Sequence, residues 1–161
     1  MVTKYHMPVD VHFGAGCLKE LGGFLAPSDR VLLVTDPGLE AAGLVDRVRD
    51  AAAPSGADLR LYDKVAPNPT ADMVEEAMVE IRAYQPTKVV ALGGGSSMDM
   101  GKVIAALCTN EGPLVDYQWN GKPFANAPLP LIAIPTTAGT GSEVTMCAVI
   151  VDRNCKKGIN G

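Results

Sequence analysis

The sequence predicts an α/β domain with a doubly wound parallel sheet. Two continuous apolar runs, at residues 30–35 and 88–92, have the length and composition of strands buried on both faces. Segments with helical periodicity lie between such runs, and strands joined by helices of this length form parallel sheets with right-handed crossovers. Ligands of these sheets bind at the carboxyl ends of the strands. The loops that follow the strands are therefore the candidate binding site.

The composition is that of one globular domain. The 161 residues are 47% hydrophobic and 20% charged, which excludes disorder, collagen-like repeats and coiled coil. A formal net charge of -4 disfavours a basic surface for nucleic acid or an anionic membrane. No apolar run approaches the roughly 20 residues of a membrane span, and residues 1–10 lack the apolar core of a signal peptide. We therefore expect a cytoplasmic protein with no nucleic-acid or membrane partner.

The other elements follow from period and turn residues. Alternation of apolar and polar side chains predicts the first strand, and weaker β-rich runs predict the others. Helices are indicated where apolar side chains recur at three- and four-residue spacing. In chain order, we expect a strand at 9–13, a helix at 18–25, a strand at 30–35, a helix at 36–52, a strand at 59–62, a helix with its apolar stripe at 74–84, a strand at 88–92, a helix at 98–108, and strands at 131–134 and 145–151.

One helix start has a clear local signal. Asp36 and Pro37 directly follow the buried strand at 30–35. They match an N-cap residue followed by proline at the first helical position. We therefore predict that a helix begins at this point, at the carboxyl end of the first buried strand.

Three successive glycines, at residues 93–95, follow the second buried strand and precede a helix. Unpaired N–H groups at a helix N-terminus favour an anion, and glycine lets the backbone approach a phosphate closely. Ser96 and Asp99 have the spacing of a capping box, which would satisfy some of these donors within the helix. The loop therefore predicts a phosphate site, with a tight turn that binds nothing as the alternative.

Neither standard nucleotide motif is present. The third glycine of G-x-G-x-x-G is replaced by Met98, and Val103 replaces the magnesium-binding hydroxyl of the Walker pattern. A second loop, residues 135–145, offers five hydroxyl groups but no nucleophile beside a base. The two histidines of the sequence, His6 and His12, would be about 20 Å apart in an extended strand and cannot share a metal ion.

Residues 93–102, GGGSSMDMGK, resemble the GGGS-x-x-D-x-x-K segment of the iron-containing (group III, metal-dependent) alcohol dehydrogenases. Residues 135–145 are similar to that family's second signature, and residues 67–70 to its N-P-T turn. The segments 13–16 and 34–36 also fit, in the same order along the chain. The resemblance therefore covers nearly the whole sequence.

The resemblance implies an NAD-dependent oxidoreductase that transfers a hydride between a primary alcohol or aldehyde and nicotinamide. It assigns residues 1–152 to a Rossmann-like NAD-binding domain, similar to the N-terminal domain of dehydroquinate synthase, and leaves 153–161 as a divergent tail. Family members are more than twice as long and hold iron or zinc with an Asp and three His in a helical domain. That domain, its metal ligands and any catalytic residue are missing here. We therefore expect a truncated chain or a fragment that binds NAD and is inactive alone.

The resemblance also implies which residues bind the coenzyme. By this resemblance, the glycine loop binds the pyrophosphate, and the threonine pair of the second loop borders the adenine. The family's basic residue near the nicotinamide corresponds to Lys157 only with a one-residue shift. The implied coenzyme-binding residues are Asp36, Asn68, Gly93, Gly94, Gly95, Ser96, Ser97, Asp99, Thr136, Thr137, Thr140, Thr145, Val149 and Lys157.

Asp36 matches the acidic residue of the family that bonds the ribose diol of adenosine. Its charge would repel a 2′-phosphate and so favour NAD over NADP, while a role only as helix N-cap stays open. By the same resemblance, Asn68 would lie near the adenosine end. Thr140, Thr145 and Val149 would line the path toward the nicotinamide.

Two other functions remain open at this point. A non-catalytic module could bind a nucleotide with the same two loops. A lyase domain like that of dehydroquinate synthase shares the fold, although residues 135–145 fit it less well. As partners we expect a small alcohol or aldehyde and a second copy of the chain, paired through the strand at 9–13 as the resemblance implies.

Overall fold

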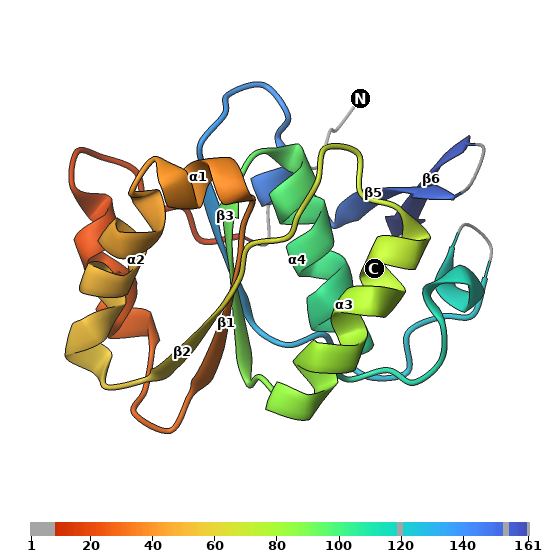
Figure 1. Ribbon diagram of the computed structural model, residues 1–161, viewed down its shortest axis with the longest axis horizontal. Helices are drawn as coiled ribbons and strands as arrows, with labels where there is room; N and C mark the ends of the chain where they lie inside the picture. The colour runs from red at the N-terminus through yellow and green to blue at the C-terminus, as the bar shows by residue number, and fades with distance from the viewer. Residues whose placement is uncertain (1–8, 119–120, 153–154, 161) are drawn as a thin grey trace, which may run out of the picture.

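The computed structural model describes residues 9–118, 121–152 and 155–160 (Figure 1). Its centre is a four-stranded parallel sheet in the order β2-β1-β3-β4. The strands are β1 (Arg30–Val34), β2 (Asp58–Tyr62), β3 (Lys88–Gly93) and β4 (Leu131–Pro135). The predicted α/β class with a parallel sheet is therefore confirmed.

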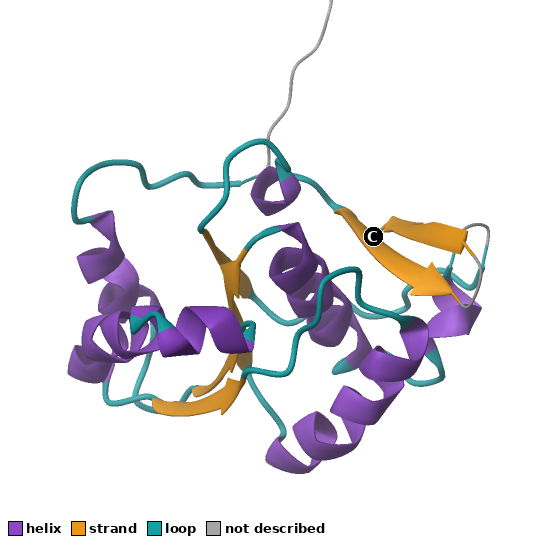
Figure 2. Ribbon diagram, turned by 45° about the horizontal axis from the view of Figure 1, so that its top comes forward, coloured by secondary structure: helices purple, strands orange, loops and turns teal. Residues whose placement is uncertain are grey.

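Helices cover both faces of this sheet (Figures 1 and 2). Alternation along β1 divides its side chains between two cores: Leu32 and Val34 pack with α3 and α4, and Val31 and Leu33 pack with η1 and α2. This is the doubly wound arrangement that the sequence predicts. The helices are α1 (Pro37–Ala41), α2 (Leu44–Ala52), α3 (Ala71–Tyr84) and α4 (Gly95–Leu107), with short 3-10 helices η1 (Cys17–Phe24), η2 (Ala53–Ser55), η3 (Leu114–Tyr117) and η4 (Ser142–Val144). Of the helices in the described ranges, none combines the length and apolar character needed to cross a bilayer.

The last two strands form a separate hairpin. β5 (Cys147–Asp152) pairs antiparallel with β6 (Cys155–Asn160) and lies outside the four-stranded sheet. The strand predicted at 145–151 is therefore present, but its predicted place in the parallel sheet is wrong. The connection from β4 to β5 holds only the short 3-10 helix η4, and β5 takes its ladder of backbone partners from the following strand β6 instead of from the parallel sheet. Strand β6 also falls within the segment 153–161, which the sequence leaves as a tail.

Two other elements differ from prediction. Residues 9–13 form no strand, because no other described strand lies beside them to supply backbone partners. Their side chains are open to solvent, with Val11 56% and Phe13 98% exposed. The helix predicted at 36–52 is split in two, because Gly43 takes a φ of 73° and starts a new helix there.

The strand order creates a crevice at the carboxyl ends of β1 and β3. From β1 the chain crosses to β2 on one side, and it then returns past β1 to reach β3 on the other side. The loops after β1 and β3 therefore leave toward opposite faces of the sheet, and crevices of this kind bind ligands. The Thr35 hydroxyl donates to the Leu92 carbonyl at 2.9 Å and ties the two strand ends together.

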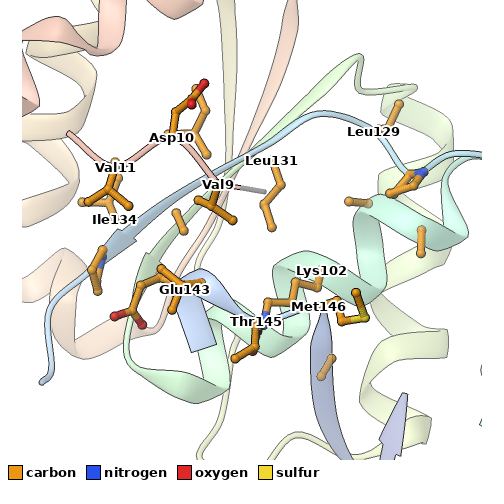
Figure 3. Close-up of a pocket in the computed structure, with 18 of the residues that line it drawn as sticks. Val9, Asp10, Val11, Lys102, Leu129, Leu131, Ile134, Glu143, Thr145 and Met146 are labelled. Carbon is orange, nitrogen blue, oxygen red and sulfur yellow. Dashed lines mark hydrogen bonds between the residues drawn. The ribbon is translucent and has the colours of Figure 1, made fainter. Parts of the chain in front are cut away.

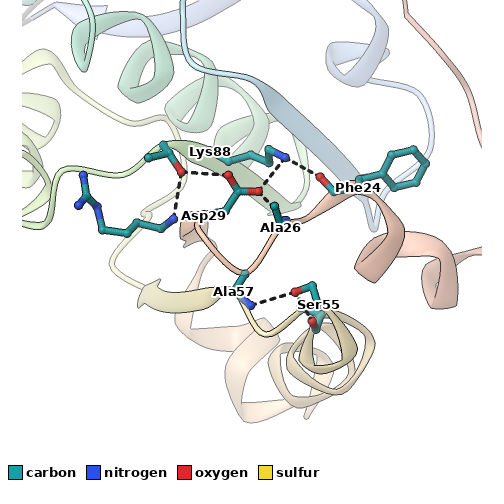
Figure 4. A network of polar contacts seen from close by, with 9 residues as sticks. Phe24, Ala26, Asp29, Ser55, Ala57 and Lys88 are labelled. Carbon is teal, nitrogen blue, oxygen red and sulfur yellow. Dashed lines mark hydrogen bonds and ion pairs between the residues drawn. The ribbon is translucent and has the colours of Figure 1, made fainter.

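The amino ends of β1 and β3 are joined by a polar network around Asp29 (Figure 4). The Asp29 carboxylate forms an ion pair with Lys88 at 3.0 Å and accepts the Ala26 N–H at 2.8 Å. Lys88 also donates to the Phe24 carbonyl, and the Thr87 hydroxyl bonds Asp29 at 3.3 Å. The Ala26 N–H first, and then the Lys88 ammonium, hold the pKa of Asp29 below its ordinary value.

We predict that Asp29→Asn lowers the free energy of unfolding at pH 7 by about 1 kcal/mol, because the variant loses a charge-assisted network. A carboxyl whose folded pKa lies below its unfolded pKa stabilises the fold above the unfolded value of about 4. That contribution is lost as the pH falls through the folded pKa, so the difference between variant and wild type should shrink below about pH 4.

Urea denaturation of both proteins at neutral and acidic pH measures this difference. Asp46→Asn is the matched control, because it breaks an exposed ion pair with Arg49 and should change stability little. A difference for Asp29→Asn that stayed constant across the acid range would contradict the prediction.

Candidate functional site

Three loops meet at the carboxyl edge of the sheet, after β1, β3 and β4. The glycine loop after β3 lies between the other two, because β3 lies between β1 and β4. The Thr136 N–H donates to the Gly93 carbonyl at 2.9 Å and joins the second loop to the glycine loop. The two loops that the sequence predicts at this edge are therefore neighbours.

The first residue of the glycine loop needs to be glycine. Gly93 has a φ of 144°, a region that L side chains rarely adopt. A Cβ at this position would also lie 2.8 Å from the Cβ of Ser97 and 3.2 Å from the Leu39 side chain. Backbone conformation and space therefore both exclude a side chain.

The other two glycines face the second loop. A Cβ on Gly94 would lie 3.1 Å from the Thr137 hydroxyl oxygen, and a Cβ on Gly95 would lie 3.3 Å from the Thr140 methyl group. Both distances are tighter than ordinary van der Waals contact. The backbone of the glycine loop thus lies directly against the two threonines.

Helix α4 begins at the glycine loop, with Gly94 as its N-cap. Glycine has no side chain with which to cap the N–H groups of the first turn. The capping box predicted between Ser96 and Asp99 is wrong: the Ser96 hydroxyl accepts the Asn68 N–H at 3.3 Å, and Asp99 binds another segment. The helix therefore starts at Gly95, one turn before its predicted start, and no N-cap side chain covers its backbone donors.

Asp36 lies across the crevice, after β1. Its Oδ1 atom accepts the N–H groups of Gly38 and Leu39 at 3.0 and 3.1 Å, which confirms the predicted N-cap of α1. These bonds use one carboxylate oxygen, and the residue is half-buried. The Oδ2 atom takes no part in the cap, so capping does not preclude a contact with a ligand.

The N-P-T turn connects the glycine loop to the hairpin. Asn68 takes a φ of 53° and donates its backbone N–H to Ser96, as noted above. Next along the turn, the Pro69 carbonyl accepts the Val151 N–H of β5 at 2.8 Å. The Thr70 hydroxyl accepts the Met73 N–H at 3.2 Å and caps α3. The turn thus holds Asn68 beside the first turn of α4.

Lys102, in the middle of α4, is a residue of the site that the sequence analysis did not select. Its ammonium donates to the hydroxyls of Ser142 and Thr145 at 2.8 and 3.3 Å, and to the Cys147 carbonyl at 2.7 Å. Burial lowers the pKa of Lys102, and the nearby Asp99 carboxylate opposes that shift. The signal was present in the sequence, because Lys102 is the lysine of the D-x-x-K segment.

Asp99 lies one turn before Lys102 and faces the same segment. Its Oδ1 atom accepts the Ser142 hydroxyl at 2.6 Å and lies 3.7 Å from the Lys102 ammonium. Its Oδ2 atom accepts the Val149 N–H at 3.1 Å. Both carboxylate oxygens of Asp99 are therefore engaged by protein groups.

A pocket of about 1360 Å³ opens beside β4 and the second loop (Figure 3). Leu131 and Ile134 of β4 line its apolar wall, and Lys102, Glu143 and Thr145 contribute polar groups. The Oε2 atom of Glu143 is buried and has no hydrogen-bond partner among the described residues. The pocket is thus largely apolar, with Lys102 and Glu143 near the hydroxyl-rich loop and Asp10 contributed by the N-terminal segment.

The remaining predicted site residues lie around this loop or outside the described side chains. Thr136 and Thr137 line the pocket. Val149 lies on β5 with 43% of its surface exposed. The backbone of Lys157 pairs with Ile150 in the hairpin, but its side chain is outside the described part of the structure.

The residues that the structure describes do not fit a metal ion. Within the described ranges, no group of three or more His, Cys, Asp or Glu side chains is arranged to hold one. His12 bonds Glu20 at 2.7 Å on the surface, and His6 lies outside the described residues. We therefore derive no chemical step through the iron or zinc that the resemblance implies.

Residues 8–160 match the family described as iron-containing alcohol dehydrogenase. The chain belongs to this family. Among its relatives, choline dehydrogenase of Bacillus subtilis is 41% identical over 158 residues, and the NAD-dependent methanol dehydrogenase of Bacillus methanolicus is 36% identical over 154 residues. Each alignment covers 94% of this chain but only 39% and 40% of the respective relative. The chain thus spans about two fifths of the length of these dehydrogenases.

Solved structures of iron-containing alcohol dehydrogenases have the same fold. One from Thermococcus thioreducens gives a TM-score of 0.91 at 25% identity, and covers 98% of this chain and 43% of its own. Sulfoacetaldehyde reductase of Bifidobacterium kashiwanohense, in complex with NAD+, gives 0.87 at 33% identity, over 100% of this chain and 43% of its own. The Rossmann-like fold that the resemblance implies is therefore confirmed.

We predict that Gly93→Ala lowers the free energy of unfolding by about 1–3 kcal/mol, because it adds a clash and a strained φ. Urea denaturation measures the loss. Gly23→Ala is the control, because a Cβ there would meet nothing within 4 Å. If the two variants were equally stable, the glycine loop would not be constrained as described.

Proposed function

We propose that this chain binds NAD through residues 1–152, as the coenzyme domain of a metal-dependent oxidoreductase of primary alcohols and aldehydes. The observation that carries the proposal is the N-terminus of α4, which lies at the crevice of the sheet without an N-cap side chain. Backbone N–H groups in this position bind diphosphates. The NAD-dependent methanol dehydrogenase and the reductase solved with NAD+ support this coenzyme.

The proposed contacts follow the order of the loops around the crevice. The glycine loop holds the pyrophosphate, the turn after β2 lies by the adenosine, and the second loop runs from the adenine toward the nicotinamide. For the pyrophosphate, the proposed residues are Gly93, Gly94, Gly95, Ser96 and Ser97. For the adenosine they are Asp36, after β1, and Asn68. Along the second loop and β5 they are Thr136, Thr137, Thr140, Thr145 and Val149, and Asp99 and Lys157 are further proposed residues of the coenzyme site.

Asp36 supports a preference for NAD over NADP. Its carboxylate lies after β1, across the crevice from the glycine loop, and keeps one oxygen outside the α1 cap. The family resemblance assigns to this position the acidic residue that bonds the adenosine ribose, and its charge would repel a 2′-phosphate.

The chain's own share of the reaction is to bind and orient the coenzyme. The nicotinamide would lie where the second loop borders the pocket beside β4, so that a small alcohol or aldehyde could approach from the apolar side. Hydride transfer from an alcohol also requires that its hydroxyl proton be removed. We assign no such step to the described residues, since their donor groups do not fit a metal ion.

We also propose a homodimer formed through residues 9–13. The exposed side chains of Val11 and Phe13, and the alternating pattern of the segment, support pairing with a second copy of this chain. The cytoplasmic location stays a prediction.

Calorimetric titration of the 161-residue chain with NAD+ should reveal one binding site per chain. Addition of ethanol and a divalent metal should produce no NADH absorbance, because the two histidines of the sequence cannot supply the family's metal ligands. An absence of binding at millimolar NAD+ would overturn the proposal. Metal-dependent NADH formation would overturn its statement that the chain lacks the proton-transfer step.

Asp36→Asn should weaken NAD+ binding about tenfold and reduce the preference for NAD+ over NADP+ by a similar factor. Asparagine keeps an oxygen that can cap α1, so the variant removes the charge and leaves the helix start in place. Calorimetry with both coenzymes measures the effect, and an unchanged melting temperature shows that the cap is retained. Equal losses for the two coenzymes would contradict the role of the charge.

A further inference from the structure

Asp99 and Lys102 form the connection between α4 and the segment 142–149. They are three residues apart on one helix, so both project from the same face. Their side chains are only 13% and 14% exposed. Figure 3 shows Lys102 reaching from α4 toward Thr145 at the edge of the pocket.

Every contact of this pair that the structure describes is made with protein groups of that segment or within the pair. The ammonium has three donors, and it makes three hydrogen bonds to residues 142, 145 and 147. The carboxylate accepts from residues 142 and 149. A buried charge that loses its partner is strongly destabilised, so these five bonds hold the segment in one position relative to α4.

Helix α4 therefore supports both ends of the proposed coenzyme site. Its first turn carries the glycine loop, which lies against Thr137 and Thr140. Its middle turns hold Thr145 and Val149 through the charged pair. The pair bonds Ser142 and Thr145 in the last part of the second loop and Val149 in β5, and this is the part of the site assigned to the nicotinamide.

We propose that Asp99 and Lys102 are positioning residues for the nicotinamide half of the coenzyme, which they orient through Ser142, Thr145 and Val149 without touching the pyrophosphate. This inference rests on the proposed function. Residues 93–102 then have two separate roles. The glycines bind the pyrophosphate, and Asp99 and Lys102 hold residues 142–149 at a fixed distance from it.

The test compares two probes that share the adenosine and pyrophosphate but differ in the nicotinamide. ADP-ribose is titrated by calorimetry, and NADH is titrated by the change of its own fluorescence, which reports the surroundings of the nicotinamide. Lys102→Met removes the charge and keeps the length of the side chain. Lys64→Met is the matched control, because Lys64 also pairs with a carboxylate, at 2.8 Å from Glu80, but is 65% exposed.

We expect Lys102→Met to weaken NADH binding about tenfold or more, with a reduced fluorescence change. ADP-ribose binding should change by less than about threefold. Ser142→Ala, a smaller change, should show the same selective loss to a lesser degree, and should add little to Lys102→Met because both act on one network. Lys64→Met should leave both probes unaffected.

The inference is overturned if Lys102→Met and Ser142→Ala each weaken the binding of NADH and ADP-ribose equally, or if neither variant weakens the binding of either probe. In both cases the proposed function still stands. If Lys102→Met does not fold, as judged by circular dichroism, the selectivity of Ser142→Ala decides the question. If the wild-type chain binds neither ADP-ribose nor NADH, the proposed function fails and this inference fails with it.

Discussion

The close approach of the glycine loop to the second loop is the constraint on which the rest of the cleft depends. Gly94 and Gly95 lie so near Thr137 and Thr140 that side chains on the glycines would force the loops apart. The sheet holds the starts of the two loops together, because β3 and β4 are adjacent strands and the Thr136 N–H donates to the Gly93 carbonyl. The sheet thus determines where the loops start, and the missing Cβ atoms determine how near they come.

The parts of the fold that could be predicted are those with local causes. Within the run at 30–35, the four buried residues of β1, at 31–34, are all apolar and at most 1% exposed. Asp36 caps the next helix with bonds to residues two and three positions ahead, and such bonds need no tertiary context. The order of strands and loops then places the candidate site at the carboxyl edge of the sheet.

The parts that were missed depend on distant partners. Ser96 and Asp99 have capping-box spacing, yet Asn68 and Ser142 offer them better tertiary bonds. Apolar and polar side chains alternate at residues 9–13, as they do in a strand. A strand also needs a neighbour to accept its backbone hydrogen bonds, and the alternation does not show whether one is present. The place of β5 in a hairpin likewise depends on the following segment. Lys102 was missed for a different reason. The sequence shows a lysine in a helix but does not show that its side chain is buried and bonded to another segment.

Helix α4 can support both ends of the cleft because it is seated directly on the sheet. A Cβ on Gly101 would lie 2.8 Å from the Cβ of Ala91 in β3, so this glycine allows the helix backbone to approach the strand closely. Gly101 lies beside Lys102 and half a turn from Asp99, and its contact fixes the height of the charged pair above the sheet. The helix cannot slide to relieve strain at its first turn without disturbing that pair. The positions of the glycine loop and of residues 142–149 are therefore coupled through one helix.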